Sequence, residues 1–289
     1  PLALERCCQV PDDFSNITLD RFRIEMLEGR PMLRLLDDRY QYVIDLTNGE
    51  YLGSFFENEA EAIAAIAAKG FRFEGQPELL GAIEQDQWTV APIYQTHRPL
   101  YHFAMNDSQR TEFYVSSTTG EVVQMTTAGT RFWNWIGAVP HWLYPTVLRQ
   151  HTYVWLQTVI WLTIVSLFLT VIGIYIGLRQ FRTRRNGRKS PYRGWGLWHH
   201  YAGLAFGLVT LTWLVSGLFS VNPWGALEGR DFFSEDQRLR GTTLDFEQAS
   251  DFALTLPGTY IPAFTVRLEG SVVGGRLNLV ASDAEGVRI

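Results

Sequence analysis

The stretch that decides the fold is Thr152-Tyr-Val-Trp-Leu-Gln-Thr-Val-Ile-Trp-Leu-Thr-Ile-Val-Ser-Leu-Phe-Leu-Thr-Val-Ile-Gly-Ile-Tyr-Ile-Gly-Leu178. It lies between Arg149 and Arg179, and none of the 29 positions between these two arginines is charged. A helix needs roughly 20 apolar residues to cross the hydrocarbon core of a bilayer, whereas soluble domains rarely leave so long a stretch uncharged. The sequence therefore predicts an integral membrane protein with a transmembrane helix at residues 151–178.

A second uncharged stretch lies between Arg193 and Glu228, and it predicts another transmembrane helix at residues 194–221. The loop that joins the two helices, residues 179–193, holds six arginines, one lysine and no acidic residue. Short loops rich in Lys and Arg stay on the cytoplasmic side of a membrane, so we expect this loop in the cytoplasm. The alternative for such a basic run is a nucleic-acid-binding patch, and the two flanking spans argue against it.

The charge of the remaining segments indicates on which side they lie. The whole chain carries −5 and the loop carries +7, which leaves −12 on the rest. We expect these acidic segments in the periplasm, on the outer side of a bacterial inner membrane. The chain begins with Pro1 and shows no signal sequence, which translocation requires, so we expect an upstream segment. It ends at Ile289 within a strand-like pattern, so we expect the last module to continue.

The soluble segments contain a repeat. Two turns, Thr47-Asn-Gly-Glu50 and Thr118-Thr-Gly-Glu121, each follow an Arg-Pro pair and a run of strand-like residues. Glycine supplies the positive φ that a tight hairpin turn needs, so Gly49 and Gly120 are predicted to have positive φ at equivalent places. The Ala-rich residues 58–70 between the two copies are expected to form a helix.

The predicted fold class is transmembrane α-helices plus α+β periplasmic modules, each a helix with an antiparallel meander. Residues 1–130 hold two tandem copies of this module, and residues 131–150 form an aromatic-rich interfacial segment. Residues 222–289 contain a further helix and strand pattern, and we expect them to be the start of a third, truncated copy.

The membrane part resembles the PepSY-associated transmembrane family of bacterial inner-membrane proteins, and the repeated unit is similar to the PepSY module. The resemblance is carried by Arg131-Phe-Trp-Asn-Trp-Ile136, Pro140-His-Trp-Leu-Tyr-Pro145, Ser190-Pro-Tyr-Arg-Gly-Trp195, Trp198-His-His-Tyr-Ala-Gly-Leu204, Thr212-Trp-Leu-Val-Ser-Gly-Leu218 and Asn222-Pro-Trp224. Members of that family typically have four membrane helices, whereas this sequence predicts two.

Four histidines lie at or inside the expected spans: His141, His151, His199 and His200. Ionisable side chains are expensive inside a bilayer and tend to be functional there. A haem iron takes one imidazole on each face, and a dry site favours the neutral imidazole that can ligate it. We therefore expect haem ligands among these histidines. The alternative is that they are interfacial residues at the level of the lipid headgroups.

Glycines on both spans fit a flat ligand. They form two pairs at close-packing spacing, Gly173 with Gly177 and Gly203 with Gly207. Glycine would let a macrocycle approach the backbone, and plain helix packing is the alternative for the same spacing.

The depth of each histidine in the membrane limits which of them could ligate the same haem. His199 and His200 lie one to two turns from the cytoplasmic face and point about 100° apart, so only one of them can face a given ligand. The first span has no histidine at their depth, so a second ligand must come from a missing helix or another subunit. His141 and His151 share the outer side and could serve a second haem.

The family resemblance implies a function for this set. Some members are haem-containing reductases of ferric siderophores with membrane histidines as ligands. His141 and one of His199 or His200 fall on the family's histidine positions, whereas His151 lies outside the motif. We therefore expect haem b and electron transfer across the membrane to a periplasmic ferric-siderophore complex, with an electron donor or partner subunit on the other side. The competing hypothesis is a membrane-anchored PepSY protein that binds or regulates a partner without redox activity.

Other residues predict little chemistry. His97 and His102 are expected to be surface residues of a strand region, and Asp37, Asp38 and Glu57 a solvated face. The only cysteines, Cys7 and Cys8, are adjacent and are expected to stay unpaired. No Gly-rich phosphate loop follows a strand, so the sequence argues against a nucleotide enzyme.

Overall fold

The computed structural model describes residues 1–4, 7–11, 17–37, 40–73, 75–182, 189–227 and 233–288. Two parts of the expectations, residues 183–188 of the basic loop and Asp38, lie outside these described residues. The chain divides into two compact units, one made of Pro1–Ala138 with Asp231–Ile289 and the other of Val139–Arg230. Mixed α+β structure and two long apolar helices agree with the predicted fold class.

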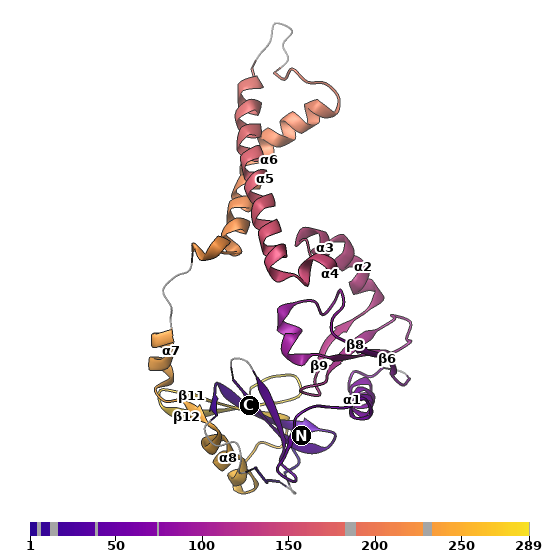
Figure 1. The fold of residues 1–289 in the computed structure, drawn as a ribbon, viewed down its shortest axis with the longest axis vertical. Coiled ribbons are helices and arrows are strands. Elements are labelled where there is room, and N and C mark those ends of the chain that lie inside the picture. The colour runs from indigo at the N-terminus through magenta and orange to yellow at the C-terminus, as the bar shows by residue number, and fades with distance from the viewer. Residues whose placement is uncertain are drawn as a thin grey trace. The chain divides into compact units, whose positions relative to one another are not determined.

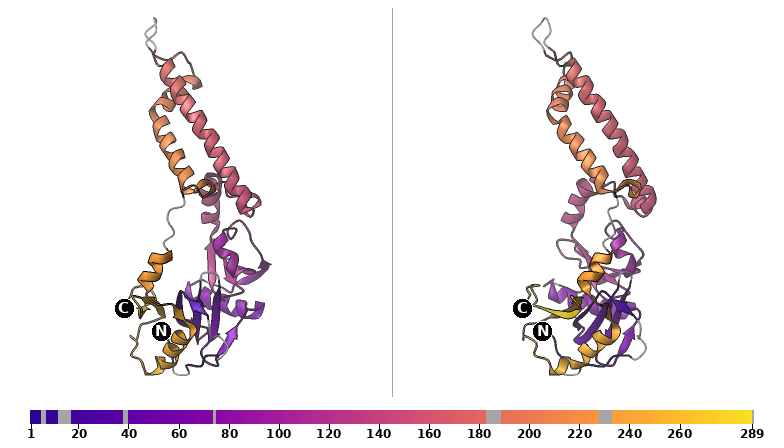
Figure 2. Two further views of the ribbon diagram at one scale, coloured as in Figure 1. Left: turned by 60° about the vertical axis from the view of Figure 1, so that its left-hand side comes forward. Right: turned by 90° about the vertical axis from the view of Figure 1, so that its left-hand side faces the viewer.

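The first unit contains two antiparallel sheets and a short strand pair, and both chain termini lie in it (Figure 2). Its strands are β1 (Thr18–Leu19), β2 (Arg21–Leu27), β3 (Arg30–Leu36), β4 (Gln41–Asp45), β5 (Glu50–Leu52), β6 (Glu78–Ile83), β7 (Leu100–Ala104), β8 (Glu112–Ser116), β9 (Val122–Thr126), β10 (Leu244–Asp245), β11 (Arg267–Val273) and β12 (Arg276–Ser282). Its helices are α1 (Glu57–Gly70), α2 (Ala128–Ile136), α7 (Phe233–Arg240) and α8 (Phe246–Thr255), with 3-10 turns η2 (Pro92–His97) and η4 (Leu256–Gly258). The strand orders are β12-β11-β2-β3-β4-β5, β6-β7-β8-β9 and β1-β10.

Alternation along the strands gives the six-stranded sheet two apolar faces. Phe22 and Ile24 of β2 pack with Leu33 of β3 and with α8 in one core cluster. Met32, on the opposite face of β3, belongs to a second cluster that contains α1 and residues of the four-stranded sheet, such as Phe103. Because successive side chains of a strand point to opposite faces, both helices can be held by one sheet.

The two predicted turns are confirmed as equivalent. Gly49 has a φ of 72° in the turn between β4 and β5, and Gly120 has a φ of 65° in the turn between β8 and β9. Each turn therefore joins the last two strands of a four-stranded meander, β2–β5 or β6–β9. At Gly120 a Cβ atom would also lie 2.9 Å from the Phe55 ring, so space as well as φ requires glycine there.

The expectation of a separate third copy is wrong. Strand β11 pairs antiparallel with β2, and α8 packs on the same sheet, so the C-terminal segment completes the first module. A hairpin with one helix buries too little apolar surface to stand alone, and β2 would otherwise leave an unpaired sheet edge. The cysteines also differ from expectation, because Cys7 and Cys8 are joined in a disulfide.

The second unit is built around two long helices that run side by side (Figure 1). Its elements are α3 (Ala138–His141), α4 (Thr146–Arg149), α5 (Thr152–Gln180), α6 (Trp195–Ser220) and the 3-10 turn η3 (Pro223–Gly225). Only 6% of the most apolar window of either long helix is buried by protein. The core helix of a soluble protein would be mostly covered, so this exposure favours two helices that lie in lipid.

Candidate functional site

A cavity of about 640 Å³ lies along α5 and α6. Its lining includes all the residues that the sequence singled out on this part of the helix pair: Gly173, Gly177, His199, His200, Gly203 and Gly207. The rest of the lining is mostly apolar, with Leu169, Ile174 and Leu204 among its members. The structure therefore brings the predicted histidines and glycines together in one place.

His200 is the histidine that holds the two helices together. Its ring is 6% exposed, with Nε2 2.9 Å from the Gly177 carbonyl oxygen and Nδ1 2.7 Å from Ser190 Oγ. A carbonyl only accepts, so Nε2 donates to it, and in the neutral imidazole Nδ1 accepts from the Ser190 hydroxyl. Both ring nitrogens are thus used, as a buried polar group requires.

His199 has the opposite character. It lines the same cavity and is exposed, and its ring has no hydrogen-bond partner within the described part of the chain. The angle of about 100° between adjacent helix positions separates the two rings. Of the pair, His199 is the one with ring nitrogens available to a ligand.

The four glycines have two different roles. A Cβ atom at Gly207 would lie 2.9 Å from Ile174 Cγ1, and one at Gly177 would lie 3.1 Å from Leu204 Cδ2. These two glycines permit close packing of α5 against α6. A Cβ atom at Gly173 or Gly203 would meet nothing within 4 Å. These two leave open backbone in the cavity that His199 also lines, where a flat group could approach.

His141 lines a second cavity, of about 410 Å³, nearer the other end of the helix pair. Its ring centroid lies 5.8 Å from that of Trp213, and Gly217 of the same lining leaves open space. Thr210 lines both this cavity and the one at His199, so the two are neighbours along one groove. His151 is exposed at the start of α5 and lines none of the described cavities, so the structure does not bring it together with His141.

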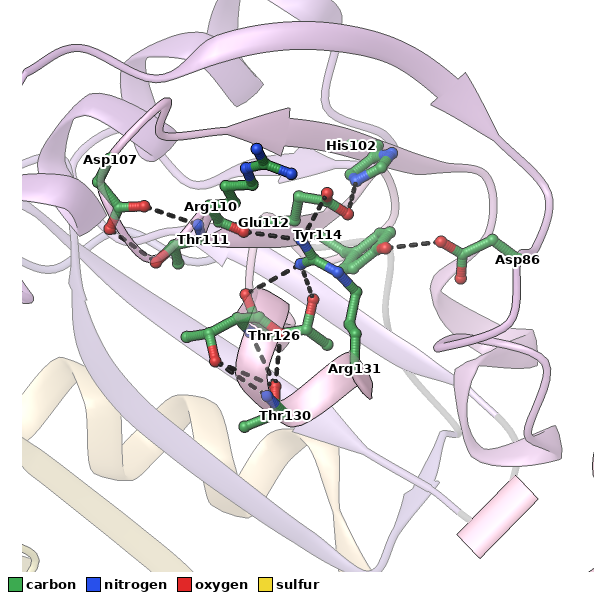
Figure 3. Close-up of polar contacts among 11 residues, drawn as sticks. Asp86, His102, Asp107, Arg110, Thr111, Glu112, Tyr114, Thr126, Thr130 and Arg131 are labelled. Carbon is green, nitrogen blue, oxygen red and sulfur yellow. Dashed lines mark hydrogen bonds and ion pairs between the residues drawn. The ribbon is translucent and has the colours of Figure 1, made fainter. Parts of the chain in front are cut away.

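The soluble unit holds a polar cluster that the sequence did not predict (Figure 3). Tyr114 is fully buried and its hydroxyl donates to Asp86 Oδ2 at 2.6 Å. Burial, and then this bond to Asp86, raises the pKa of Tyr114 far above its usual range. The ring of His102 stacks on Tyr114 with centroids 4.4 Å apart, and its Nε2 lies 3.1 Å from Glu112 Oε2. His102 is therefore not the exposed surface residue that was expected, because cross-strand neighbours cover most of its side chain.

Arg131 connects this cluster to helix α2. Its Nη2 lies 3.1 Å from Glu112 Oε1 and donates to the Arg110 carbonyl at 2.9 Å, and its Nη1 donates to Thr126 Oγ1. Figure 3 shows these bonds converging on the guanidinium. These bonds fasten the first turn of α2 to the sheet.

His97 also departs from the expected surface role. Its Nδ1 lies 3.2 Å from Ser116 Oγ, beside the turn of Gly120. Burial lowers the pKa of His97, with Arg34 adding to this effect and Glu121 opposing it. Asp86 and Glu112 gave no sequence signal, and Arg131 gave one only as part of the motif Arg131–Ile136, because the partners in this cluster come from separate strands and loops.

Comparison with known proteins agrees with the membrane architecture. Residues 47–260 match the family described as PepSY-associated TM region. No curated protein and no solved structure matches the chain. The family match covers well over half of the 289 residues and includes both α5 and α6. The chain is therefore a membrane protein with two spanning helices, and it belongs to the PepSY-associated TM region family.

Proposed function

We propose that the protein binds haem in the groove between α5 and α6 and carries electrons across the membrane to a ferric complex. The observation that supports this best is the position of His199, whose free ring lines a cavity of about 640 Å³ beside the open backbone of Gly173 and Gly203. A spanning helix that served only as an anchor would need none of these features, and an unsatisfied imidazole there would be a penalty.

The lining fits the chemical demands of haem. The macrocycle needs an apolar slot with close backbone approach, and the iron needs a neutral imidazole. Gly173 and Gly203 supply the approach, and His199 supplies the imidazole. His200 stays in its bonds to Gly177 and Ser190 and keeps the helices at the separation that the slot requires.

A second imidazole to hold the haem would come from outside the helix pair. Among the described residues that line this cavity, His199 and His200 are the only histidines, and His200 is already bonded through both nitrogens. A further helix or a partner subunit would therefore supply the other imidazole. His141 could ligate a second haem in the neighbouring cavity, whereas His151 is not a ligand in this proposal.

Haem b would supply one-electron chemistry, and this chain would supply position and insulation. Two haem sites along one groove would divide the membrane thickness into shorter transfers. The final acceptor in this proposal is a ferric siderophore at the periplasmic PepSY units, which makes the protein a membrane oxidoreductase of the ferric-siderophore reductase type. The electron donor lies on the cytoplasmic side.

The test is haem content in histidine variants of the full-length protein, purified in detergent. His199→Ala is expected to lose about half or more of the haem per folded protein, because two similar sites would share it. The matched control is His151→Ala, an exposed histidine of the same helix pair, which should keep all of it. Folding is checked by circular dichroism for each variant.

Two outcomes would contradict the proposal. A colourless wild-type protein would favour the competing hypothesis of a PepSY anchor without redox activity. Unchanged haem in His199→Ala, in His141→Ala and in the double variant would remove both sites. Loss of haem in His200→Ala together with loss of helix packing is expected and does not identify a ligand.

A further inference from the structure

Arg149 is a buried arginine at one end of the helix pair. It ends α4, three positions before α5, and is only 9% exposed. Its guanidinium carbon lies 4.3 Å from the centroid of the Trp155 ring and 5.4 Å from that of Tyr144. Aromatic faces attract a guanidinium, so these two rings help to hold the group in place.

The hydrogen-bonding capacity of Arg149 is mostly unused. A guanidinium has five N–H donors, and the described structure shows one bond, from Nη1 to Thr152 Oγ1 at 3.2 Å. Nε is enclosed without an acceptor. Arg34, which is buried even more completely at 1% exposure, instead bonds to Glu25 and to the Thr119 carbonyl. A buried charge is normally paired in this way, because leaving it unpaired is strongly unfavourable.

The sequence holds no counter-ion for Arg149 near its own helices. No Asp or Glu occurs between Glu121 and Glu228. Among the described residues of this unit there is therefore no acidic side chain to pair with Arg149.

The N-terminal end of α5, next to Arg149, also attracts a negatively charged group. Helix α5 has 29 residues, and its first turn has no side-chain cap. The free N–H groups of an uncapped first turn and the positive end of the helix dipole favour an oxyanion. Arg149 reaches this turn directly through its bond to Thr152.

We propose that Arg149 and the first turn of α5 bind the phosphate of an anionic phospholipid. The site lies where a spanning helix begins, which is the depth of the lipid headgroups. Trp142, Tyr144 and Trp155 surround it, as aromatic residues do at a membrane interface. The Trp155 indole N–H is already bonded to the Trp142 carbonyl at 3.0 Å, so this side of the site is preorganised. A phosphate diester offers the paired oxygens that suit the guanidinium edge.

The experiment measures lipid binding to the full-length protein in detergent. Native mass spectrometry would compare phosphatidylglycerol with phosphatidylcholine, whose phosphate is offset by its own cation. The wild type is expected to prefer phosphatidylglycerol by about tenfold, as one charge-assisted hydrogen bond would give. Arg149→Met keeps the side-chain length between the rings and is expected to lose this preference. The control Arg193→Met removes an exposed arginine near the start of α6 and should keep it.

A second measurement guards against misfolding. Phosphatidylglycerol is expected to raise the melting temperature of the wild type and of Arg193→Met, but not of Arg149→Met, while all three melt cooperatively without lipid. Arg149→Lys keeps the charge but loses the planar fork, so its preference should fall in between. An unchanged preference in both Arg149 variants would overturn the proposal. So would equal binding of the two lipids by the wild type, or loss of the lipid preference in millimolar inorganic phosphate.

Discussion

Substituting the glycines of the helix pair separates packing from ligand binding. Gly207 and Gly203 are one helical turn apart on α6, yet their surroundings differ. A Cβ atom at Gly207 would lie 2.9 Å from Ile174 Cγ1, whereas one at Gly203 would meet nothing within 4 Å. Gly207→Ala should therefore force α5 and α6 apart, and Gly203→Ala should not.

The size of the effect follows from this contact. Two carbon atoms normally rest at about 3.5–4.0 Å, so the new methyl group is roughly 1 Å too close. Ile174 is β-branched and stiff at χ1, so it cannot easily turn away. Overpacking of this kind costs about 1–3 kcal/mol, whereas alanine in place of glycine favours a helix by up to about 1 kcal/mol in water. Gly207→Ala is expected to be destabilised by about 1–2 kcal/mol, and Gly203→Ala to be neutral or slightly stabilised.

The assay is reversible unfolding of the full-length protein in mixed micelles, followed by circular dichroism. Ile174→Ala removes the atoms that would clash with a methyl group at position 207. Gly207→Ala should therefore cost less stability in the Ile174→Ala background than in the wild type. Haem content gives the complementary result, because Gly203→Leu should fill the open cavity and displace haem without loss of stability. Equal stability of Gly207→Ala and Gly203→Ala, or haem retained in Gly203→Leu, would refute the assignment of the two glycines.

Three further predictions concern the rest of the chain. Tyr114→Phe should destabilise the soluble unit by about 1.5–3 kcal/mol in denaturant unfolding, because a buried bond to the Asp86 carboxylate is lost; a change below about 0.5 kcal/mol would contradict this. Burial lowers the pKa of His97, so the unfolded chain takes up a proton near pH 6.5 before the folded protein does, and stability should fall as the pH drops from above about 6.5 toward the folded-state pKa. His97→Asn should flatten that part of the pH dependence of the melting temperature, and an unchanged slope would exclude His97 as its source. Arg185→Cys, in the expected cytoplasmic loop, should resist a membrane-impermeant thiol reagent in intact cells, and efficient labelling would reverse the proposed orientation.

The sequence by itself determined the features that depend on local physics. An uncharged run of 29 residues predicts a spanning helix because the bilayer excludes charge, whatever the rest of the chain does. The turns at Gly49 and Gly120 were predictable because a tight hairpin turn needs positive φ, which glycine alone adopts at little cost. The family motifs likewise lie in continuous stretches of the chain.

Tertiary structure alone decided which of two similar residues does what. His199 and His200 are neighbours in sequence, but only His200 meets the Gly177 carbonyl and Ser190. Gly203 and Gly207 follow one pattern, and Ile174 on the other helix makes them different.

The same holds in the soluble unit. The sequence pattern of the C-terminal strands predicted a separate module. In the structure, β11 instead pairs with the edge of β2 and extends the first sheet. His102 gave the pattern of an exposed strand residue, and Tyr114 on the next strand covers it. In each case the deciding partner is distant in sequence. A pattern of residue types along the chain indicates the secondary structure that a segment prefers. It does not indicate which distant residues will form hydrogen bonds with its polar groups or pack against its side chains.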